Sequence, residues 1–216
     1  MELTDAIQDY LKEIYKLGVE SERVTTSALA RRQRVSAASA SAMVKKLAAL
    51  GLAEHAPYRG VSLTHAGEQV ALEVIRHHRL LEQYLAETLG LGIDAVHAEA
   101  DRLEHVISEE LEARIDEKLG YPTQDPHGDP IPDADLKIQR RTLRSLDALE
   151  PGEEATVERV PDGDPALLRY LALLRLLPGR RVTLRRSEPF EGPVTVLVDG
   201  SEHAISRDLA GQIGVA

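Results

Sequence analysis

Apolar residues in the first third of the chain recur at intervals of three and four, the spacing of helices that cover a core. The first such helix follows Thr4, a good N-cap residue, and ends at Gly18; its apolar stripe is Ile7, Tyr10, Leu11, Ile14 and Leu17. A short second helix follows hydroxyl residues at 25–27, and a third begins at Ser36 and runs to residue 50. Two β-type runs then flank residues 57–60, which predicts a hairpin.

The predicted third helix has two different faces. Its buried face carries Ala40, Met43, Val44, Leu47 and Leu50, and its other face carries Ser39, Ala42, Lys45 and Lys46. Small and cationic side chains let a helix approach a DNA groove closely. Residues 23–59 hold seven basic groups against one acid, and Arg59 stands at the tip of the hairpin. This combination predicts a winged helix-turn-helix that binds duplex DNA, whereas a generic small α/β fold would not need the basic charge.

The middle of the chain predicts two long helices, 65–89 and 93–119, separated by a glycine-rich break at 90–92. Such a helical hairpin can serve as a dimerisation unit. His78 and Glu82 stand one turn apart on the apolar stripe of the first of these helices, where polar groups need a partner. They can bind a metal ion together, or His78 can be a hydrogen-bonded core residue, and the spacing allows both.

Four potential metal ligands share one face of the second predicted helix. His97, Asp101, Glu104 and His105 fall within roughly 100° of arc at helical periodicity. The apolar stripe of the same helix lies beside them, so these groups would sit at the margin of a core, where crowded like charges raise each other's pKa values or recruit a cation. The alternative is a solvated acidic face with two incidental histidines.

The last part of the chain is predicted to contain a loop, then a linker, then a small domain of strands. Residues 121–135 are rich in proline, glycine and aspartate, which predicts a loop; Asp125, His127 and Asp129 in it can be ligands or turn formers, and we expect turn formers. Residues 136–152 are predicted to be a linker. From residue 153 onward, short alternating strands surround one helix at 165–177, which predicts a small β-barrel.

Composition excludes several classes of protein. The chain has 216 residues, 43% of them hydrophobic, enough for real cores. It has no cysteine, which excludes disulfides, thiolate zinc sites, iron–sulfur clusters and cysteine nucleophiles. Aromatic residues make up 3% of the chain, too few for a single-strand binder that stacks bases. No apolar run approaches a membrane span and the N-terminus lacks signal-peptide character, so we expect a cytoplasmic protein with no membrane partner.

The order of these elements and two specific motifs resemble the diphtheria-toxin-repressor family of metal-dependent transcriptional regulators. The motifs are the AxRLEH run at 100–105 and the HGDPIP run at 127–132, and the leucine-rich run at 168–179 is similar to the family's SH3-like (FeoA-type) domain. The resemblance covers essentially the whole chain. It implies a mainly α N-terminal part, with a winged helix-turn-helix domain at 1–64 and a helical dimerisation and metal-binding domain at 65–135, then the linker and an SH3-like β-barrel domain at 153–216. It also implies a homodimer that binds operator DNA, has no small organic substrate and is not an enzyme.

The same resemblance implies two metal sites. The regulatory site falls on Asp9, Asp101, Glu104 and His105, with His78 as a possible further ligand. The second site falls on Glu82, His97 and a residue of the barrel, for which we expect Asp164, with Asp125 and His127 as an alternative source.

The chain departs from the family pattern at two informative positions. Iron-responsive members tend to have methionine and cysteine where this chain has Asp9 and Asp101, and oxygen and imidazole ligands favour Mn²⁺, with Fe²⁺ also possible. Lys12 stands where short members place a glutamate, which favours two separate sites over a closely spaced metal pair.

These sites predict a linkage switch in which the metal fixes the angle between the DNA-binding and dimerisation units. We expect base contacts from Ser36, Ala38, Ser39 and Ala42, and phosphate contacts from Thr26, Ser27, Ser41, Lys45 and Arg59. Two alternatives stay open at this point. One is a metal-dependent hydrolase, although the chain has no HExxH, nucleophile elbow or phosphate-binding glycine loop. The other is a winged-helix protein whose central helices form a plain dimer core and sense no metal.

Overall fold

The computed structural model describes residues 3–20, 24–56, 60–139 and 141–216. Its internal contacts divide the chain into two units. The first unit comprises Met1–His78, Leu103–Ser108 and Pro132–Lys137, and the second comprises Arg79–Arg102, Glu109–Ile131 and Ile138–Ala216. Each unit is described separately below.

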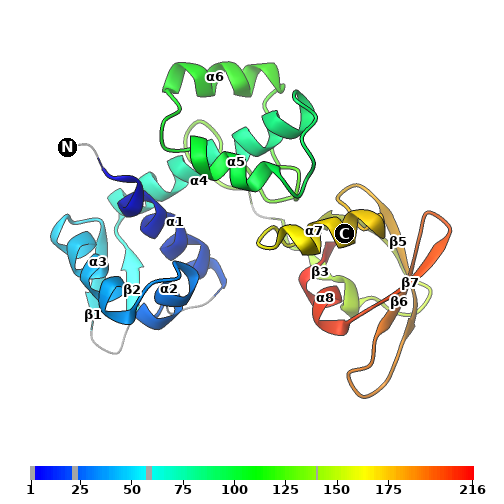
Figure 1. The fold of residues 1–216 in the computed structure, drawn as a ribbon. Coiled ribbons are helices and arrows are strands. Elements are labelled where there is room, and N and C mark those ends of the chain that lie inside the picture. Colours follow the sequence, from blue (N-terminus) through cyan, green and yellow to red (C-terminus); the bar gives the residue numbers. More distant parts are fainter. Residues whose placement is uncertain (1–2, 21–23, 57–59, 140) are drawn as a thin grey trace. The chain divides into compact units, whose positions relative to one another are not determined.

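The first unit begins with three helices and a hairpin, the order that the sequence predicts (Figure 1). These elements are α1 (Asp5–Glu20), α2 (Thr26–Arg32), α3 (Ala37–Ala49), β1 (Ala53–Ala56) and β2 (Gly60–Leu63). The apolar stripes meet in one core that includes Ile7, Leu11, Ile14, Leu29, Val44 and Leu47. The hydroxyl of Thr25 accepts a hydrogen bond from the backbone of Ala28 and thereby caps α2. Arg59, expected at the hairpin tip, lies outside the described residues.

The fourth helix, α4, spans His65–Glu87, close to its predicted range. Thr64 caps it, because its Oγ1 accepts from the backbone nitrogen of Gly67 at 3.2 Å. Val74, Ile75, Leu81 and Leu85 lie on the apolar stripe of this helix and are buried, whereas Leu89, inside the predicted range, lies beyond the helix and is 58% exposed. The prediction was therefore wrong only for the last residues of this helix.

The single helix predicted at 93–119 was wrong: the structure has two helices, α5 (Val96–Leu103) and α6 (Glu109–Lys118). A turn closes after α5, where the backbone nitrogen of Val106 donates to the carbonyl of Leu103 at 3.1 Å. Three glutamates stand in the first turn of α6, where acidic groups complement the N-terminal end of a helix dipole. Glu104 and His105 consequently lie in the turn and not on a helix face.

The second unit contains a six-stranded antiparallel sheet in the order β3-β8-β4-β5-β6-β7. Its strands are β3 (Arg144–Ser145), β4 (Glu154–Arg159), β5 (Arg181–Ser187), β6 (Val194–Val198), β7 (Ser201–Ile205) and β8 (Gly214–Val215). The sheet shares one apolar core with α7 (Pro165–Leu173), α8 (Arg207–Gln212) and the 3-10 turn η1 (Leu146–Ala148).

Part of this sheet lies in the segment that was expected to be a linker. Arg144 of β3 pairs with Val215 of β8, and Leu146 of η1 is fully buried in the core of the sheet. This short edge strand was not predicted, because residues 136–145 are mostly polar. Within the part of the chain that the structure describes, no helix is long and apolar enough to cross a membrane.

The cap of α3 gives a first test of this fold. Ser36 Oγ accepts from the backbone nitrogen of Ser39 at 3.1 Å, so Ser36→Ala removes a partner from an otherwise unpaired helix-end donor. We expect Ser36→Ala to lower the free energy of unfolding by about 1 kcal/mol, and Ser36→Asp to preserve it, in urea titrations followed by circular dichroism. Equal stability of the alanine and aspartate variants would contradict the assigned cap.

Candidate metal centres

A buried carboxylate is the centre of the first cluster of polar groups. The side chain of Glu104 is 1% exposed, and its two oxygens have different partners. Oε1 accepts from the ammonium of Lys12 at 2.6 Å, and Oε2 accepts from Nδ1 of His78 at 2.6 Å. His77, the neighbour of His78 on α4, contacts the backbone oxygen of Glu104 through Nδ1 at 3.0 Å. The turn after α5 is therefore held by side chains of both α1 and α4.

His105 completes this first cluster together with Asp9 of α1. Its Nε2 lies 3.0 Å from Oδ1 of Asp9 and 3.3 Å from Oε1 of Glu104. The three residues each offer one ligand atom, and these atoms all lie within 4.8 Å of one another. Two carboxylates and an imidazole at this separation suit a hard or borderline divalent cation. The donor set therefore fits a metal ion, and it includes three of the four residues expected for the regulatory site.

In the first cluster, burial and neighbouring positive charges act in opposite directions on the pKa values of the two carboxyl groups. Burial raises the pKa of Asp9, although His105 and Lys12 act in the opposite direction. Burial alone would also raise the pKa of Glu104, but the hydrogen bond from His78 and the charge of Lys12 outweigh it and hold this pKa below its usual value. Glu104 is thus ionised at neutral pH even though it is buried. An ionised, preorganised carboxylate is a good metal ligand.

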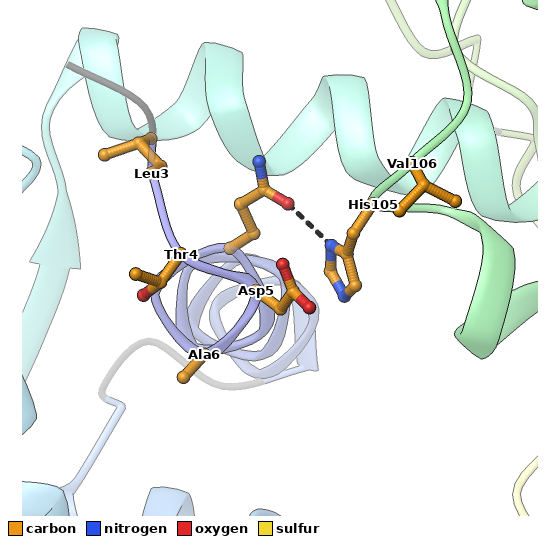
Figure 2. A pocket seen from close by; sticks show the side chains of 7 residues that line it. Leu3, Thr4, Asp5, Ala6, His105 and Val106 are labelled. Carbon is orange, nitrogen blue, oxygen red and sulfur yellow. Dashed lines mark hydrogen bonds between the residues drawn. The ribbon is translucent and has the colours of Figure 1, made fainter.

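An open hollow reaches His105 from the surface of the first unit. It has a volume of about 620 Å³, and its lining residues are Leu3, Thr4, Asp5, Ala6, Gln8, His105 and Val106. Figure 2 shows the His105 ring turned toward the start of α1, where Asp5 and Thr4 flank the hollow. The hollow gives a hydrated cation an entry path to the ring.

A second cluster joins α4 to the loop at 121–131 inside the second unit. Glu82, Asp125 and His127 are 1%, 6% and 0% exposed. Nδ1 of His127 lies 3.7 Å from Oε2 of Glu82 and 4.0 Å from Oδ1 of Asp125, and no hydrogen-bond partner reaches this buried atom. The opposite ring nitrogen, Nε2, donates to the carbonyl of Ile93 at 3.1 Å. Nδ1 is therefore left as the coordinating atom, and the cluster fits a metal ion.

The loop is shaped to present these groups. Oδ1 of Asp125 accepts from the backbone nitrogens of His127 and Asp129, which closes a tight turn. The carbonyl of His127 accepts from the backbone nitrogen of Val160 at 2.9 Å, so the loop is attached to the sheet domain. Gly128 has a φ of +91°, and a Cβ there would lie 1.8 Å from the carbonyl oxygen of Glu158. Only glycine permits this approach of two backbones.

Two groups of the second cluster are strongly perturbed. Burial raises the pKa of Asp125 to about 7, and the nearby carboxylates of Glu82 and Asp129 add to this effect. Burial would lower the pKa of His127, but the nearby carboxylates of Glu82 and Asp125 outweigh it and raise this pKa to about 9. The metal-free cluster therefore holds protons at neutral pH that a bound cation has to displace.

The structure places the remaining candidate ligands of the second unit as follows. Nδ1 of His97 donates to Oε1 of Glu82 at 2.9 Å, which brings His97 beside the second cluster. Asp101 lies 3.7 Å from Nε2 of the same histidine, and its side chain is 47% exposed. Asp164 is exposed and caps α7, since its Oδ1 accepts from the backbone nitrogen of Ala166 at 2.8 Å. Asp125 and His127, expected to be turn formers, form the turn and also face Glu82.

The candidate DNA contacts lie on α2 and α3 of the first unit. Ser36, Ala38, Ser39, Ala42 and Lys45 are exposed on α3 or at its start, and Ser41 is half-buried. Ser27 is exposed and Thr26 half-buried in the first turn of α2. The hydroxyls of Ser36 and Ser39 also bond to each other at 2.9 Å, so they are held in place before any partner arrives. The exposed side of α3 thus carries small side chains and cations, as the sequence predicts.

Three contacting residues were missed by the sequence reasoning. Gln8 accepts from His105, His77 contacts the backbone of Glu104, and Arg79 lies 3.5 Å from Asp125 through Nε. Gln8 is next to Asp9 in the sequence, and His77 and Arg79 are both next to His78. Neighbouring residues on a helix point about 100° apart, so adjacency alone does not predict a shared partner. Only the position of the opposing segment reveals these contacts.

Three family models match the chain in succession. Residues 2–61 match "Iron dependent repressor, N-terminal DNA binding domain", and residues 64–133 match "Iron dependent repressor, metal binding and dimerisation domain". Residues 144–216 match the FeoA domain. The first cluster draws its ligands from the first two matched segments, and the second draws its ligands from the metal-binding segment.

Individual proteins match over almost the whole chain. The iron-dependent repressor IdeR of Mycobacterium leprae is 34% identical over 94% of this chain and 92% of its own length. A solved manganese-dependent transcriptional repressor in complex with manganese has a TM-score of 0.90 and 41% identity, covering 97% of this chain and 99% of that chain. ScaR with bound Zn²⁺ has a TM-score of 0.82 and 31% identity, covering 97% and 98%.

The close approach at Gly128 yields a prediction for the second unit. Gly128→Ala adds a Cβ that clashes with the backbone of Glu158, whereas Gly152, with a φ of +92°, has nothing within 4 Å of the same position. Both variants carry the backbone strain of a positive φ, but only Gly128→Ala overpacks. We expect it to cost about 2 kcal/mol more than Gly152→Ala in urea unfolding. Equal losses of unfolding free energy in the two variants would show that the loop can move away from β4 at no energetic cost.

Proposed function

Since the chain belongs to the diphtheria-toxin-repressor family of metal-dependent DNA-binding repressors, we propose that it is a homodimer in which Mn²⁺ controls binding to double-stranded operator DNA. The family consists of transcriptional repressors and not of enzymes, which removes the hydrolase alternative. The metal-binding groups then serve regulation. The observation that carries the proposal is the cluster of Asp9, Glu104 and His105.

The chemistry of the donors supports manganese. Both clusters consist of carboxylate oxygens and imidazole nitrogens, and the chain has no cysteine. Hard oxygen donors with one or two imidazoles suit Mn²⁺ and Fe²⁺ better than thiophilic ions. Fe²⁺ is the second candidate, because the mycobacterial relative is named an iron-dependent repressor. Availability in the cell would decide between them as much as affinity does.

The first cluster is the proposed sensing site. Asp9 is a residue of α1, which packs directly on α2 and α3, whereas Glu104 and His105 belong to the turn after α5. When bound there, the metal supplies positive charge that both carboxylates can share. A bound ion would hold Asp9 and Glu104 together and would thereby fix α1 against the turn. Asp101, expected as a further ligand of this site, stays a prediction.

Lys12 supports a single ion at the sensing site. Its ammonium, buried with 7% side-chain exposure, already occupies Oε1 of Glu104 at 2.6 Å. A second divalent ion close to the first would have to share this space with a fixed cation, and like charges in a partly desolvated place repel strongly. Lys12 therefore favours two separate metal sites over a closely spaced pair.

Glu82, Asp125 and His127 form the proposed second site, with His97 beside them. The partnerless Nδ1 of His127 and the burial of all three residues support this choice of ligands over Asp164, whose carboxylate caps α7. The sequence left open which of the two sites His78 serves. Its hydrogen bond to Glu104 supports a role at the sensing site. The carbonyl of His127 in the loop of the second site also accepts from the backbone nitrogen of Val160, directly after β4.

The proposed DNA surface is the exposed side of α3. Ser36, Ala38, Ser39 and Ala42 would contact bases, and Thr26, Ser27, Ser41, Lys45 and Arg59 would contact phosphates. Short side chains make few bidentate base contacts, so sequence-dependent DNA shape would contribute much of the specificity. Leu103 and Val106, which are 40% and 74% exposed, support an apolar surface available to a second copy.

The metal switch can be tested directly on DNA. We propose to select duplexes from a random pool with the protein in MnCl₂, and then to measure affinity for the enriched duplex by fluorescence anisotropy. Replacing MnCl₂ with EDTA should weaken binding roughly 5- to 150-fold, the usual range of coupling between two sites. Equal affinity in both conditions would rule out the switch.

Matched variants assign this effect to the sensing site. Glu104→Gln should remove most of the Mn²⁺ dependence, because it keeps the shape of the side chain but loses the carboxylate that Lys12 and His78 hold. Glu99→Gln is the control, since Glu99 is exposed on α5 and pairs with Arg102. A manganese response that survives Glu104→Gln would place the sensing site elsewhere.

The second site should bind Mn²⁺ with a steep pH dependence. A proton on His127, with its pKa of about 9, and one on Asp125, with its pKa of about 7, must leave before these groups can coordinate. Affinity should therefore be highest above the pKa of His127. It should fall about tenfold per pH unit between the two pKa values, and faster below that of Asp125. Anaerobic Mn²⁺ titrations of Glu104→Gln, read by electron paramagnetic resonance, isolate this site; a flat profile would refute the assignment.

A further inference from the structure

Gln8 makes the shortest contact of His105, and no role has been assigned to it so far. Oε1 of Gln8 lies 2.6 Å from Nδ1 of His105, and the dashed line in Figure 2 marks this hydrogen bond. An amide oxygen has only lone pairs, so the ring nitrogen that faces it must carry a hydrogen. Nδ1 therefore donates to Gln8, and Nε2, which faces the carboxylate of Asp9 at 3.0 Å, donates there in the absence of a metal.

The other nitrogen of the same ring faces the carboxylates. Nε2 lies 3.0 Å from Asp9 and 3.3 Å from Glu104, in the space that the three donor atoms surround. A metal ligand must present a lone pair, and an imidazole has one lone pair when its opposite nitrogen is protonated. A bound cation would displace the proton on Nε2, whereas the amide of Gln8 keeps the one on Nδ1. The amide therefore leaves Nε2 as the coordinating atom and aims it at the cluster.

We infer that Gln8 is the positioning residue of the proposed sensing site: it selects the tautomer and the orientation of His105 that make Nε2 the ligand. This inference rests on the proposed function, since it assumes that Asp9, Glu104 and His105 hold the metal. Gln8 and Asp9 are consecutive in α1. One helix therefore supplies a ligand and also orients the ligand that comes from the opposing turn.

The second cluster performs the same task with different atoms. There Nε2 of His127 donates to the backbone carbonyl of Ile93, and Nδ1 faces the carboxylates. A backbone acceptor cannot be removed by substitution, whereas the amide of Gln8 can. Outer partners of ligand histidines typically change metal affinity 10- to 100-fold when they are removed. The sensing site is therefore the one whose orienting group can be tested cleanly.

The test compares two substitutions at this position in the full-length protein. Gln8→Met keeps the length of the side chain but removes the acceptor, and Gln8→Glu keeps an acceptor oxygen. We expect Mn²⁺ affinity, read by electron paramagnetic resonance of free Mn²⁺, to fall roughly 10- to 100-fold in Gln8→Met and to be retained in Gln8→Glu. Gln212→Met, at an exposed glutamine of α8, is the control and should bind as the unsubstituted protein does.

A readout without metal separates positioning from a general loss of structure. Histidine ring ¹⁵N shifts of the metal-free protein, with the signal assigned by His105→Gln, report which ring nitrogens carry a hydrogen. We expect Nδ1–H in the unsubstituted protein and in Gln8→Glu, and a shift toward the Nε2–H tautomer in Gln8→Met.

The outcomes distinguish the inference from the proposed function. If the unsubstituted protein binds Mn²⁺ in a Glu104-dependent way and Gln8→Met binds equally well or keeps its tautomer, the inference is overturned and the sensing site stands. An Nε2–H tautomer in the unsubstituted protein overturns it as well. If no Glu104-dependent binding is found, the sensing site and the inference fall together.

Discussion

The burial of one ionised carboxylate, that of Glu104, is the constraint on which the first unit depends. A charge with 1% exposure is costly unless it is paired on every side. Lys12 of α1 and His78 of α4 meet this demand with contacts of 2.6 Å each, and His77 fixes the backbone behind it. Side chains of α1 and α4 and the turn after α5 thus all meet at the carboxylate of Glu104. The same group is then available, ionised and fixed, as a metal ligand.

Both clusters need a histidine nitrogen with a lone pair that faces the carboxylates, and the two clusters use opposite ring nitrogens for this. At His105 the hydrogen stays on Nδ1 and faces Gln8, and Nε2 faces the carboxylates. At His127 the hydrogen stays on Nε2 and faces the carbonyl of Ile93, and Nδ1 faces the carboxylates. Ring orientation in both cases is fixed by an uncharged oxygen. Neutral acceptors keep the imidazole a neutral ligand, which suits sites whose negative charge already comes from carboxylates.

Local chemistry made the three N-terminal helices predictable, because caps such as Ser36 and the apolar stripes mark where they start, although α1 continues to Glu20, past its expected end at Gly18. The break after α5 was not predictable from periodicity, since Leu103 and Leu111 continue the apolar spacing across it, although both are at least 40% exposed. The residue types of the two clusters were predictable, because carboxylates and imidazoles are the oxygen and nitrogen donors that divalent cations bind. The grouping of these residues was not predictable: His127 meets Glu82 only because the loop at 121–131 folds onto α4, and no local pattern carries that information.

The two clusters differ in what a metal has to displace, and this difference supports separate roles. In the first, the competing cation is the ammonium of Lys12, which is covalently attached to α1 and can only move aside with its helix or its own stem. In the second, the competitors are protons on Asp125 and His127, which leave for solvent without any change of backbone. Because Asp9 belongs to α1, loading the first cluster would be coupled to the placement of α1, and thus to the helices packed on it. Loading the second changes the charge of a loop that Val160 already holds to the sheet. Coupling to α1 is the property that a switch on DNA binding requires.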